Sequence, residues 1–215
     1  MYSPVQVIPK FLNYLNLRNE ENESIKYLVN IKGGWEKWLQ LEFSNMMRIN
    51  WRKNATEIHL GERERCDIGI NLKWTITNSE YLFIELKCMT TNQNYNDVVK
   101  GMKDDIIKIS ENKCIPMDYK FVVGFFVVDQ LYYDPYALDW KNGNVIRDAS
   151  FRSSQSLRNS WKEIVEDGQQ LSGLYEKPTF QGIMFTNDFG IATICAQVNS
   201  QKEDGNEIPM EIESE

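Results

Sequence analysis

The sequence predicts an α/β fold in which helices flank a mixed β-sheet. Two runs rich in β-branched and aromatic residues, 66–71 and 81–88, enclose a Thr-Asn-Ser-Glu break, a pattern typical of a β-hairpin. Apolar residues recur at helical spacing on both sides of this hairpin, over 35–49 and 94–112. Residues 119–128 are almost continuously apolar, which indicates a central strand covered on both faces.

The length and composition fit one globular domain. At 215 residues and 25.2 kDa the chain can bury a sizeable core. No run of 18 apolar residues is present, and Pro4, Pro9 and Lys10 stand where a signal peptide would be apolar, so we expect a soluble, cytoplasmic protein without a membrane partner. The cysteines are widely spaced and form no CxxC pair, which indicates neither a zinc ribbon nor a disulfide framework. They are Cys66, Cys88, Cys114 and Cys195.

Three parts are expected along the chain. Residues 1–32 form an N-terminal helical extension, in which Pro9 can open one helix and Ser24 can cap a second. Residues 33–198 form the main domain, with a core over 33–130 and an elaboration over 131–198 that contains a helix near 156–170 and strands at 180–186 and 190–198. Residues 199–215 form an acidic tail with few apolar groups, which we expect to be disordered.

The helix predicted from Trp35 to Ile49 carries an anomalous carboxylate. Its apolar face consists of Trp35, Trp38, Leu39, Phe43, Met46 and Ile49. Glu42 falls near the middle of this face, and Glu36 lies on its flank. Such a carboxylate needs either a metal ion or a cationic partner, for which Arg48 and Arg52 are candidates.

The hairpin brings three ionisable residues together. Strand alternation places Glu85 and Lys87 on one face of the second strand, and Asp67 lies on the first strand. Direct opposition of Asp67 and Glu85 requires a turn centred near residue 76, whereas the composition indicates a turn at Asn78 and Ser79. A bulge or a diagonal contact would close this gap.

Asp67, followed by Glu85-Leu86-Lys87, resembles the motif of the PD-(D/E)xK nuclease superfamily, which has the restriction-endonuclease-like fold. The predicted order of helix, three strands, helix and strand over residues 33–130 is similar to the αβββαβ core of that family. Cys66 occupies the position of the family's usual proline.

The resemblance implies a Mg²⁺ site, which Mn²⁺ could also fill. Asp67, Glu85 and the backbone carbonyl of Leu86 would be ligands, and Lys87 would orient or deprotonate the attacking water or neutralise the transition state. The family often adds a glutamate from the preceding helix. Glu42 is the preferred match and Glu36 the second choice.

Basic residues after the hairpin are candidates for nucleic-acid binding. Asn94 or Asn96 can cap a helix that ends near Asn112, and Lys100, Lys103 and Lys108 lie along it, either as a solvated face or as phosphate contacts. Tyrosines and tryptophan alternate with Arg147, Arg152 and Arg158 over 129–160, a pattern that suits base stacking, packing within the loop or a dimer contact. From both groups, Lys103, Lys108, Arg147 and Arg152 are the predicted nucleic-acid contacts.

The net charge of −7 is concentrated at the C-terminus. Residues 197–215 contain six acidic residues and one lysine, a net of −5, which leaves −2 on the rest. Nucleic-acid binding would therefore depend on local basic residues, on a homodimer or on a partner protein.

These observations predict a Mg²⁺-dependent endonuclease, with DNA favoured over RNA, acting in restriction, phage defence or DNA processing. Two alternatives remain: a non-catalytic nucleic-acid-binding or assembly subunit of the same fold, and a structural ion-pair cluster in an ordinary α/β domain.

Overall fold

The computed structural model describes residues 7–21, 34–51, 55–59, 65–71, 81–89, 93–112, 119–129, 146–147, 152–167, 171–186 and 189–199. The helices are α1 (Val7–Glu21), α3 (Gly34–Trp51), α4 (Tyr95–Glu111) and α5 (Arg152–Trp161), and α5 runs on into the π-helical η4 (Lys162–Glu166). The strands are β1 (Ala55–His59), β2 (Arg65–Asn71), β3 (Tyr81–Cys88), β4 (Tyr119–Asp129), β5 (Ile146–Arg147), β6 (Thr179–Thr186) and β7 (Phe189–Val198).

The described strands form one open, mixed sheet, as the sequence predicts. Its order is β1-β2-β3-β4-β7-β6-β5. The first three strands are antiparallel, β3 and β4 are parallel, and β4, β7, β6 and β5 are antiparallel to their neighbours. Helix α4 connects the parallel pair, because parallel strands need a long crossover connection. The chain order α3-β1-β2-β3-α4-β4 is the predicted order of helix, three strands, helix and strand.

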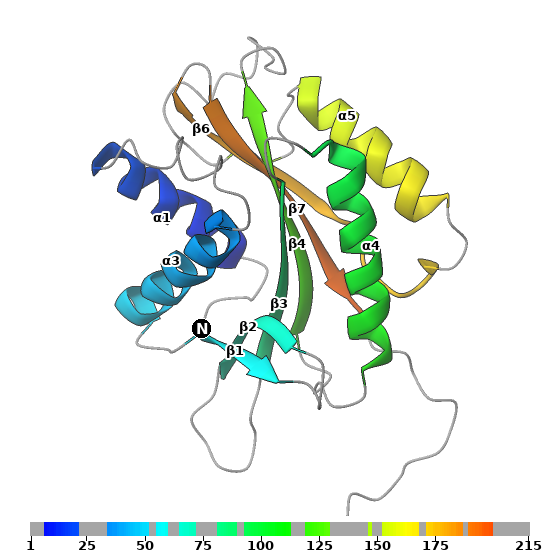
Figure 1. The fold of residues 1–215 in the computed structure, drawn as a ribbon, viewed down its shortest axis with the longest axis horizontal. Coiled ribbons are helices and arrows are strands. Elements are labelled where there is room, and N and C mark those ends of the chain that lie inside the picture. The colour runs from blue at the N-terminus through cyan, green and yellow to red at the C-terminus, as the bar shows by residue number, and fades with distance from the viewer. Residues whose placement is uncertain are drawn as a thin grey trace, which may run out of the picture.

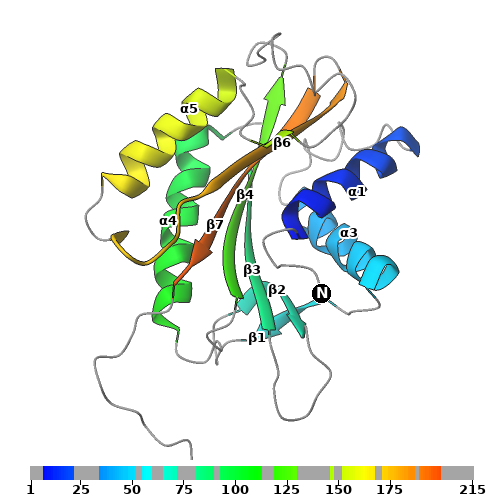
Figure 2. The same cartoon turned by 180° about the vertical axis from the view of Figure 1, so that it is seen from behind.

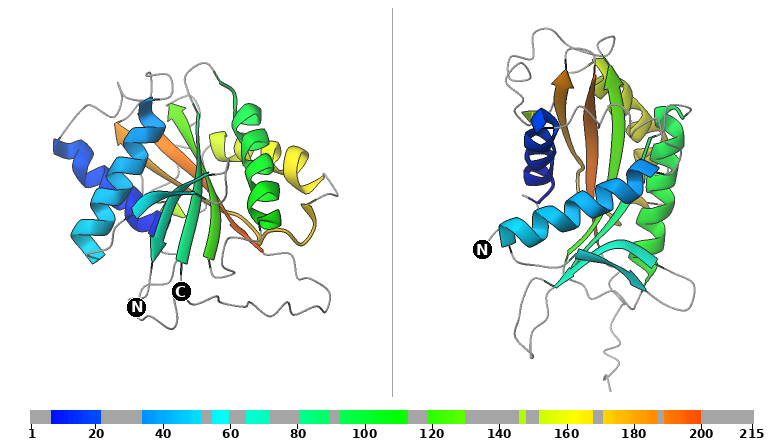
Figure 3. Two further views of the ribbon diagram at one scale, coloured as in Figure 1. Left: turned by 60° about the horizontal axis from the view of Figure 1, so that its bottom comes forward. Right: turned by 60° about the vertical axis from the view of Figure 1, so that its left-hand side comes forward.

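Helices cover both faces of the sheet. Helices α1 and α3 lie on one face, and α4 and α5 lie on the other (Figures 1 and 2). The end-on view in Figure 3 shows the resulting three layers. Along β3, Leu82, Ile84 and Leu86 pack in the core under α1 and α3, while Phe83 packs in the core under α4 and α5. Strand β3 is therefore covered on both faces.

The pairing of β2 with β3 sets Asp67 opposite Glu85. Ile68 pairs with Ile84, and Ile70 pairs with Leu82. Both pairs are centred on residue 76, the centre that direct opposition of Asp67 and Glu85 requires. Residues 72–80, with the turn expected at Asn78 and Ser79, lie outside the described residues. The recorded register ends at the pair Ile68 and Ile84, and its extension by one residue sets Asp67 opposite Glu85 without a bulge.

Helix α3 confirms most of its predicted apolar face but not its last turn. Trp35, Leu39, Phe43 and Met46 are buried, whereas Ile49 is 65% exposed. Met47 is buried instead, and at 100° per residue Ile49 lies about 200° round the helix from it. Among the described side chains of α3, the last buried one is therefore Met47, two residues before Ile49.

The N-terminal boundary of α4 is confirmed. Asn94 is the N-cap and accepts the Asp97 N–H, while the Asp97 carboxylate accepts the Asn94 N–H, a complete capping box. The C-cap is Asn112, where the sequence predicted the helix to end. Strands β6 and β7 also match the predicted pair to within one residue.

Other expectations are met in part or lie outside the described residues. Helix α5 begins at Arg152, four residues before the predicted start, and η4 ends at Glu166. The second N-terminal helix, the aromatic residues of 130–145, Cys114 and the tail beyond Asn199 are not among the described residues. None of the described helices is long and apolar enough to cross a membrane.

Candidate active site

Asp67 and Glu85 are held against one another across the hairpin. The backbone N–H of Asp67 donates to Glu85 Oε2 at 3.0 Å, and the N–H of Leu86 donates to Asp67 Oδ2 at 2.8 Å. Each carboxylate thus accepts a backbone donor from the opposite strand. Because the N–H and C=O of one strand residue point to the same edge, the Leu86 carbonyl also points towards β2. The structure therefore brings together the three predicted ligand positions.

Two lysines, one from β3 and one from α4, lie on the side of the cluster that faces α4. The Lys87 Nζ lies 3.0 Å from Asp105 Oδ2, an ion-pair separation without the angles of a hydrogen bond. The Lys108 Nζ donates to Glu85 Oε1. A Cβ added at Gly101 would lie 3.2 Å from Lys87 Cε, so the lysine stem crosses the helix where no side chain stands. Gly101, Asp105 and Lys108 share one face of α4, at i, i+4 and i+7.

Helix α3 closes the other side. Gln40 Nε2 donates to Asp67 Oδ1 at 2.8 Å, and Gln40 Oε1 accepts from Lys37 Nζ at 3.1 Å. Glu36, one turn before Gln40, interacts electrostatically with both Asp67 and Lys87. The helix carboxylate beside the hairpin is therefore Glu36, the second choice from the sequence.

Glu42 lies on a different side of α3. Its Oε2 accepts the Tyr14 hydroxyl at 2.8 Å and lies 3.8 Å from Arg18 Nε. Glu42 is two residues from Gln40, about 200° round the helix, so it cannot face Asp67 while Gln40 does. The predicted placement of Glu42 with the hairpin is wrong: its buried carboxylate joins α1 to α3, with Arg18 beside it. Of the two expected arginines, Arg52 lies outside the described residues.

The carboxylates of the cluster raise one another's proton affinity. Burial raises the pKa of Asp67 to about 6, and the charge of Glu85 adds to this rise. Burial, followed by the charge of Asp67, also raises the pKa of Glu36. Burial raises the pKa of Asp105, and the neighbouring lysines offset this only in part.

The two lysines remain charged. Burial by itself lowers the pKa of Lys87, but the carboxylates of Asp105, Glu85 and Glu36 outweigh it and raise that pKa overall. The pKa of Lys108 is raised in the same way, chiefly through its hydrogen bond and charge interaction with Glu85. Four carboxylates and two ammonium groups leave the cluster with a net charge of −2.

The donor chemistry of this cluster fits Mg²⁺ as a two-carboxylate site. The described residues contain no group of three or more His, Cys, Asp or Glu arranged to hold a metal ion. Mg²⁺ is commonly held by one or two carboxylates with water completing its shell, so Asp67 and Glu85 are enough. A divalent cation would also neutralise the net charge of −2.

The predicted nucleic-acid contacts are not gathered at this cluster. Lys108 is part of it through Glu85, whereas Lys103 lies about 140° away round α4. Arg147 belongs to β5, four strand spacings or about 19 Å from β3. Arg152 is the first residue of α5. Arg158, from the same predicted segment, stacks 4.2 Å from the centre of the Phe180 ring.

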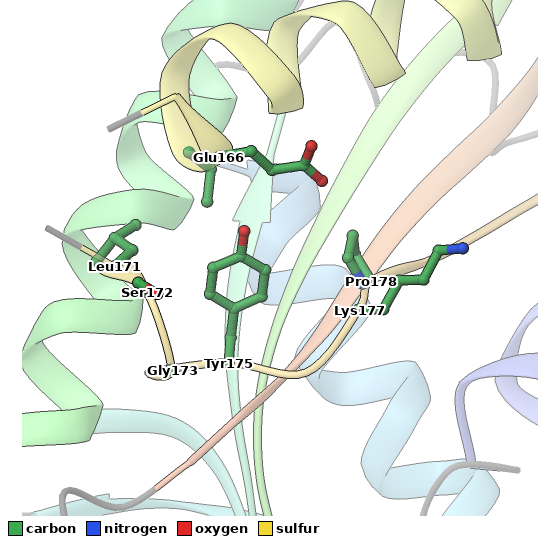
Figure 4. A pocket seen from close by; sticks show the side chains of 8 residues that line it. Glu166, Leu171, Ser172, Gly173, Tyr175, Lys177 and Pro178 are labelled. Carbon is green, nitrogen blue, oxygen red and sulfur yellow. The ribbon is translucent and has the colours of Figure 1, made fainter. Parts of the chain in front are cut away.

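A pocket of about 320 Å³ lies apart from the cluster, below η4. Figure 4 shows the Tyr175 ring between Leu171 and Pro178, with its hydroxyl end towards Glu166. The pocket is open, its charged residues Glu166 and Lys177 are exposed, and none of the hairpin residues lines it. It therefore provides no reason to move the candidate site away from the hairpin.

Sequence reasoning missed Gln40, Gly101 and Asp105. The sequence contains a signal for Asp105, since it is a charged residue directly beside the apolar stripe of α4. In the structure the residue is only 7% exposed. Gly101 and Gln40 had no such signal, because their roles depend on which strand residues lie beneath them.

No protein-family model, curated protein or solved structure matches this chain.

Proposed function

We propose that this chain is a Mg²⁺-dependent nuclease with a restriction-endonuclease-like core. The observation that carries the proposal is the meeting of Asp67, Glu85 and Lys87 at one point, with two carboxylates directly opposed and a lysine two residues further along. The order α3-β1-β2-β3-α4-β4, with β3 parallel to β4, supports it as well.

The chain's own residues would divide the work of phosphodiester hydrolysis. Asp67, Glu85 and the Leu86 carbonyl would hold Mg²⁺, which supplies a Lewis acid and lowers the pKa of bound water. Lys87 would act as an ammonium ion, since Asp105 and the other carboxylates keep it protonated, and would stabilise negative charge developing on the phosphate. Glu36 and Gln40 would orient Asp67 and the water near it.

The test is cleavage of plasmid, single-stranded DNA and RNA by purified protein with Mg²⁺, Mn²⁺ or EDTA. We expect metal-dependent cleavage, favouring DNA, that Glu85→Gln reduces at least about a hundredfold. The matched control is Glu42→Gln, a second buried carboxylate that contacts α1 instead, in which the folded fraction should cleave normally. Full activity in Glu85→Gln would contradict the proposal, provided circular dichroism shows both variants folded.

One observation favours the two alternatives without catalysis, a structural ion-pair cluster and a binding or assembly subunit. Each oxygen of Asp67 and Glu85 already accepts from a protein donor, as in a self-contained ion-pair network. Absence of cleavage together with metal-independent binding of labelled DNA would support the role of a binding subunit.

A further inference from the structure

One of the four donors around the two ligand carboxylates differs from the rest. Three are uncharged and built into the fold: the N–H of Asp67, the N–H of Leu86 and the side-chain amide of Gln40. The fourth is the ammonium of Lys108, at the end of a flexible side chain that is 30% exposed. The Glu85 side chain that it contacts is only 5% exposed.

A carboxylate buried as deeply as Glu85 requires a counter-charge. Lys108 supplies it in the metal-free protein, on the residue that would also bind Mg²⁺. Two cations on one carboxylate group would repel, so Lys108 and the metal ion compete for Glu85.

Lys87 provides the contrast. Its partner Asp105 lies on α4 and is not one of the ligand positions, so a metal ion on the hairpin leaves this ion pair in place. Asp105 also interacts with Lys108, which keeps a released Lys108 close to the cluster. Of the two lysines, only Lys108 has to change partner.

We propose that Lys108 is an exchangeable counter-ion: it neutralises Glu85 in the metal-free protein, leaves when Mg²⁺ binds, and then contacts a phosphate of the nucleic acid. This inference rests on the proposed nuclease function and assigns Lys108 a positioning role in it. Removal of Lys108 should therefore strengthen the binding of Mg²⁺ and weaken the binding of nucleic acid. Removal of a merely structural residue would weaken the binding of both.

The experiment compares wild-type, Lys108→Met and Lys103→Met full-length chains. Calorimetric titration of the metal-free proteins should show Mg²⁺ binding about fivefold more tightly to Lys108→Met, because a competitor has been removed. Anisotropy of a labelled DNA duplex in Mg²⁺, read while a gel shows it uncut, should show weaker binding with a salt dependence reduced by about one phosphate contact. Lys103→Met loses the same charge from the same helix, about 140° away, and should leave Mg²⁺ affinity unchanged.

Lys108→Arg tests the exchange in a variant that keeps the charge. The guanidinium can bind both Glu85 oxygens as a fork, so Mg²⁺ should bind more weakly than to wild type. Unchanged or weaker Mg²⁺ affinity in Lys108→Met, or an unchanged salt dependence of DNA binding, overturns the inference while the nuclease proposal stands. Absence of Mg²⁺ binding by wild type and every variant overturns both.

Discussion

Asp67 is the residue on which the candidate site depends most. It accepts one hydrogen bond from each side, from Gln40 and from the Leu86 N–H, yet it faces the charge of Glu85 across the hairpin. These contacts fix its position without removing the repulsion. A site built to bind a cation has this property, because the unfavourable interaction is relieved only when the ligand arrives.

Replacing Asp67 by asparagine should stabilise the metal-free protein in a pH-dependent way. The folded pKa is raised from 3.8 to about 6, so the folded state binds a proton that the unfolded chain has already lost. The contribution of Asp67 to the stability of the metal-free protein should therefore fall as pH rises from about 4 to about 6, a loss of about 1–3 kcal/mol that asparagine avoids. Urea unfolding in EDTA across this range measures the effect.

The same titration contains its own control. Asp104→Asn, at an exposed aspartate on α4, makes the same carboxylate-to-amide change away from the hairpin and is measured beside Asp67→Asn. In Asp67→Asn the new amide keeps the Leu86 hydrogen bond through its oxygen, and the Gln40 amide can turn over to accept from its nitrogen. A difference in the free energy of unfolding between Asp67→Asn and wild type that stays constant with pH would show that the pKa of Asp67 is not raised in the folded protein.

The sequence could predict the meeting of Asp67, Glu85 and Lys87 because strand alternation and hairpin pairing are local rules. It could not choose correctly between Glu36 and Glu42. A helical stripe shows which residues lie on one side of a helix, but α3 has two neighbours, and Tyr14 and Arg18 of α1 take the side on which Glu42 lies. That choice depends on packing between elements more than 20 residues apart.

At the scale of elements, α4 is both a regular helix of the fold and the source of residues for the candidate site. Its ends follow from its own sequence, since Asn94 and Asp97 form the capping box. Its contribution to the site depends on position above β3, where Gly101 leaves room for Lys87 and Asp105 meets its ammonium. This explains why the helix was predictable and its role in the site was not.

Two glycines beneath and on α4 should respond oppositely to alanine. At Gly101 the added methyl group meets only the flexible end of Lys87, at 3.2–3.3 Å, and the helix gains up to about 1 kcal/mol from the loss of glycine. At Gly124 the methyl group would lie 2.4 Å from Met102 Sδ and 2.8 Å from the Phe126 ring, which overpacks a closed core and costs about 1–3 kcal/mol. Urea denaturation distinguishes the two.

Cleavage activity tests whether the placement of Lys87 against α4 matters. Gly101→Ala shifts the Lys87 stem and should reduce cleavage, while any weakening of the Lys87–Asp105 ion pair offsets part of the stability gained from the loss of glycine. Gly124 is the ladder partner of Lys87 in the β3–β4 pair, so Gly124→Ala tests stability only and is not a control for cleavage. Gly101→Ala with full activity would show that the placement of Lys87 against α4 is not needed.

At the scale of the molecule, one sheet serves two cores. Phe125 of β4 packs under α1 and α3, and Phe126, the next residue, packs under α4 and α5. The strands shared by both cores couple them. Helix α1 belongs fully to this arrangement, since Phe11, Leu12 and Leu15 have no exposed surface.

This coupling predicts that a change in α1 alters stability on the far face of the sheet. Phe11 makes edge-to-face contacts with Phe43 at 4.8 Å and with Phe125 at 6.2 Å between ring centres. Its replacement by alanine should lower the free energy of unfolding by about 3–5 kcal/mol. Leu17→Ala on the same helix is the control, because Leu17 is 63% exposed and its loss should cost no more than about 0.5 kcal/mol.

Hydrogen exchange shows whether α1 acts on the whole domain. In Phe11→Ala, amides of α4 on the opposite face should lose protection together with those of α3, since both helices depend on β3 and β4. If α4 kept wild-type protection while α1 exchanged freely, α1 would unfold separately from the main domain. The complete burial of Phe11 beside Phe125 argues for the first outcome, because no boundary can be drawn between α1 and the sheet without opening the core.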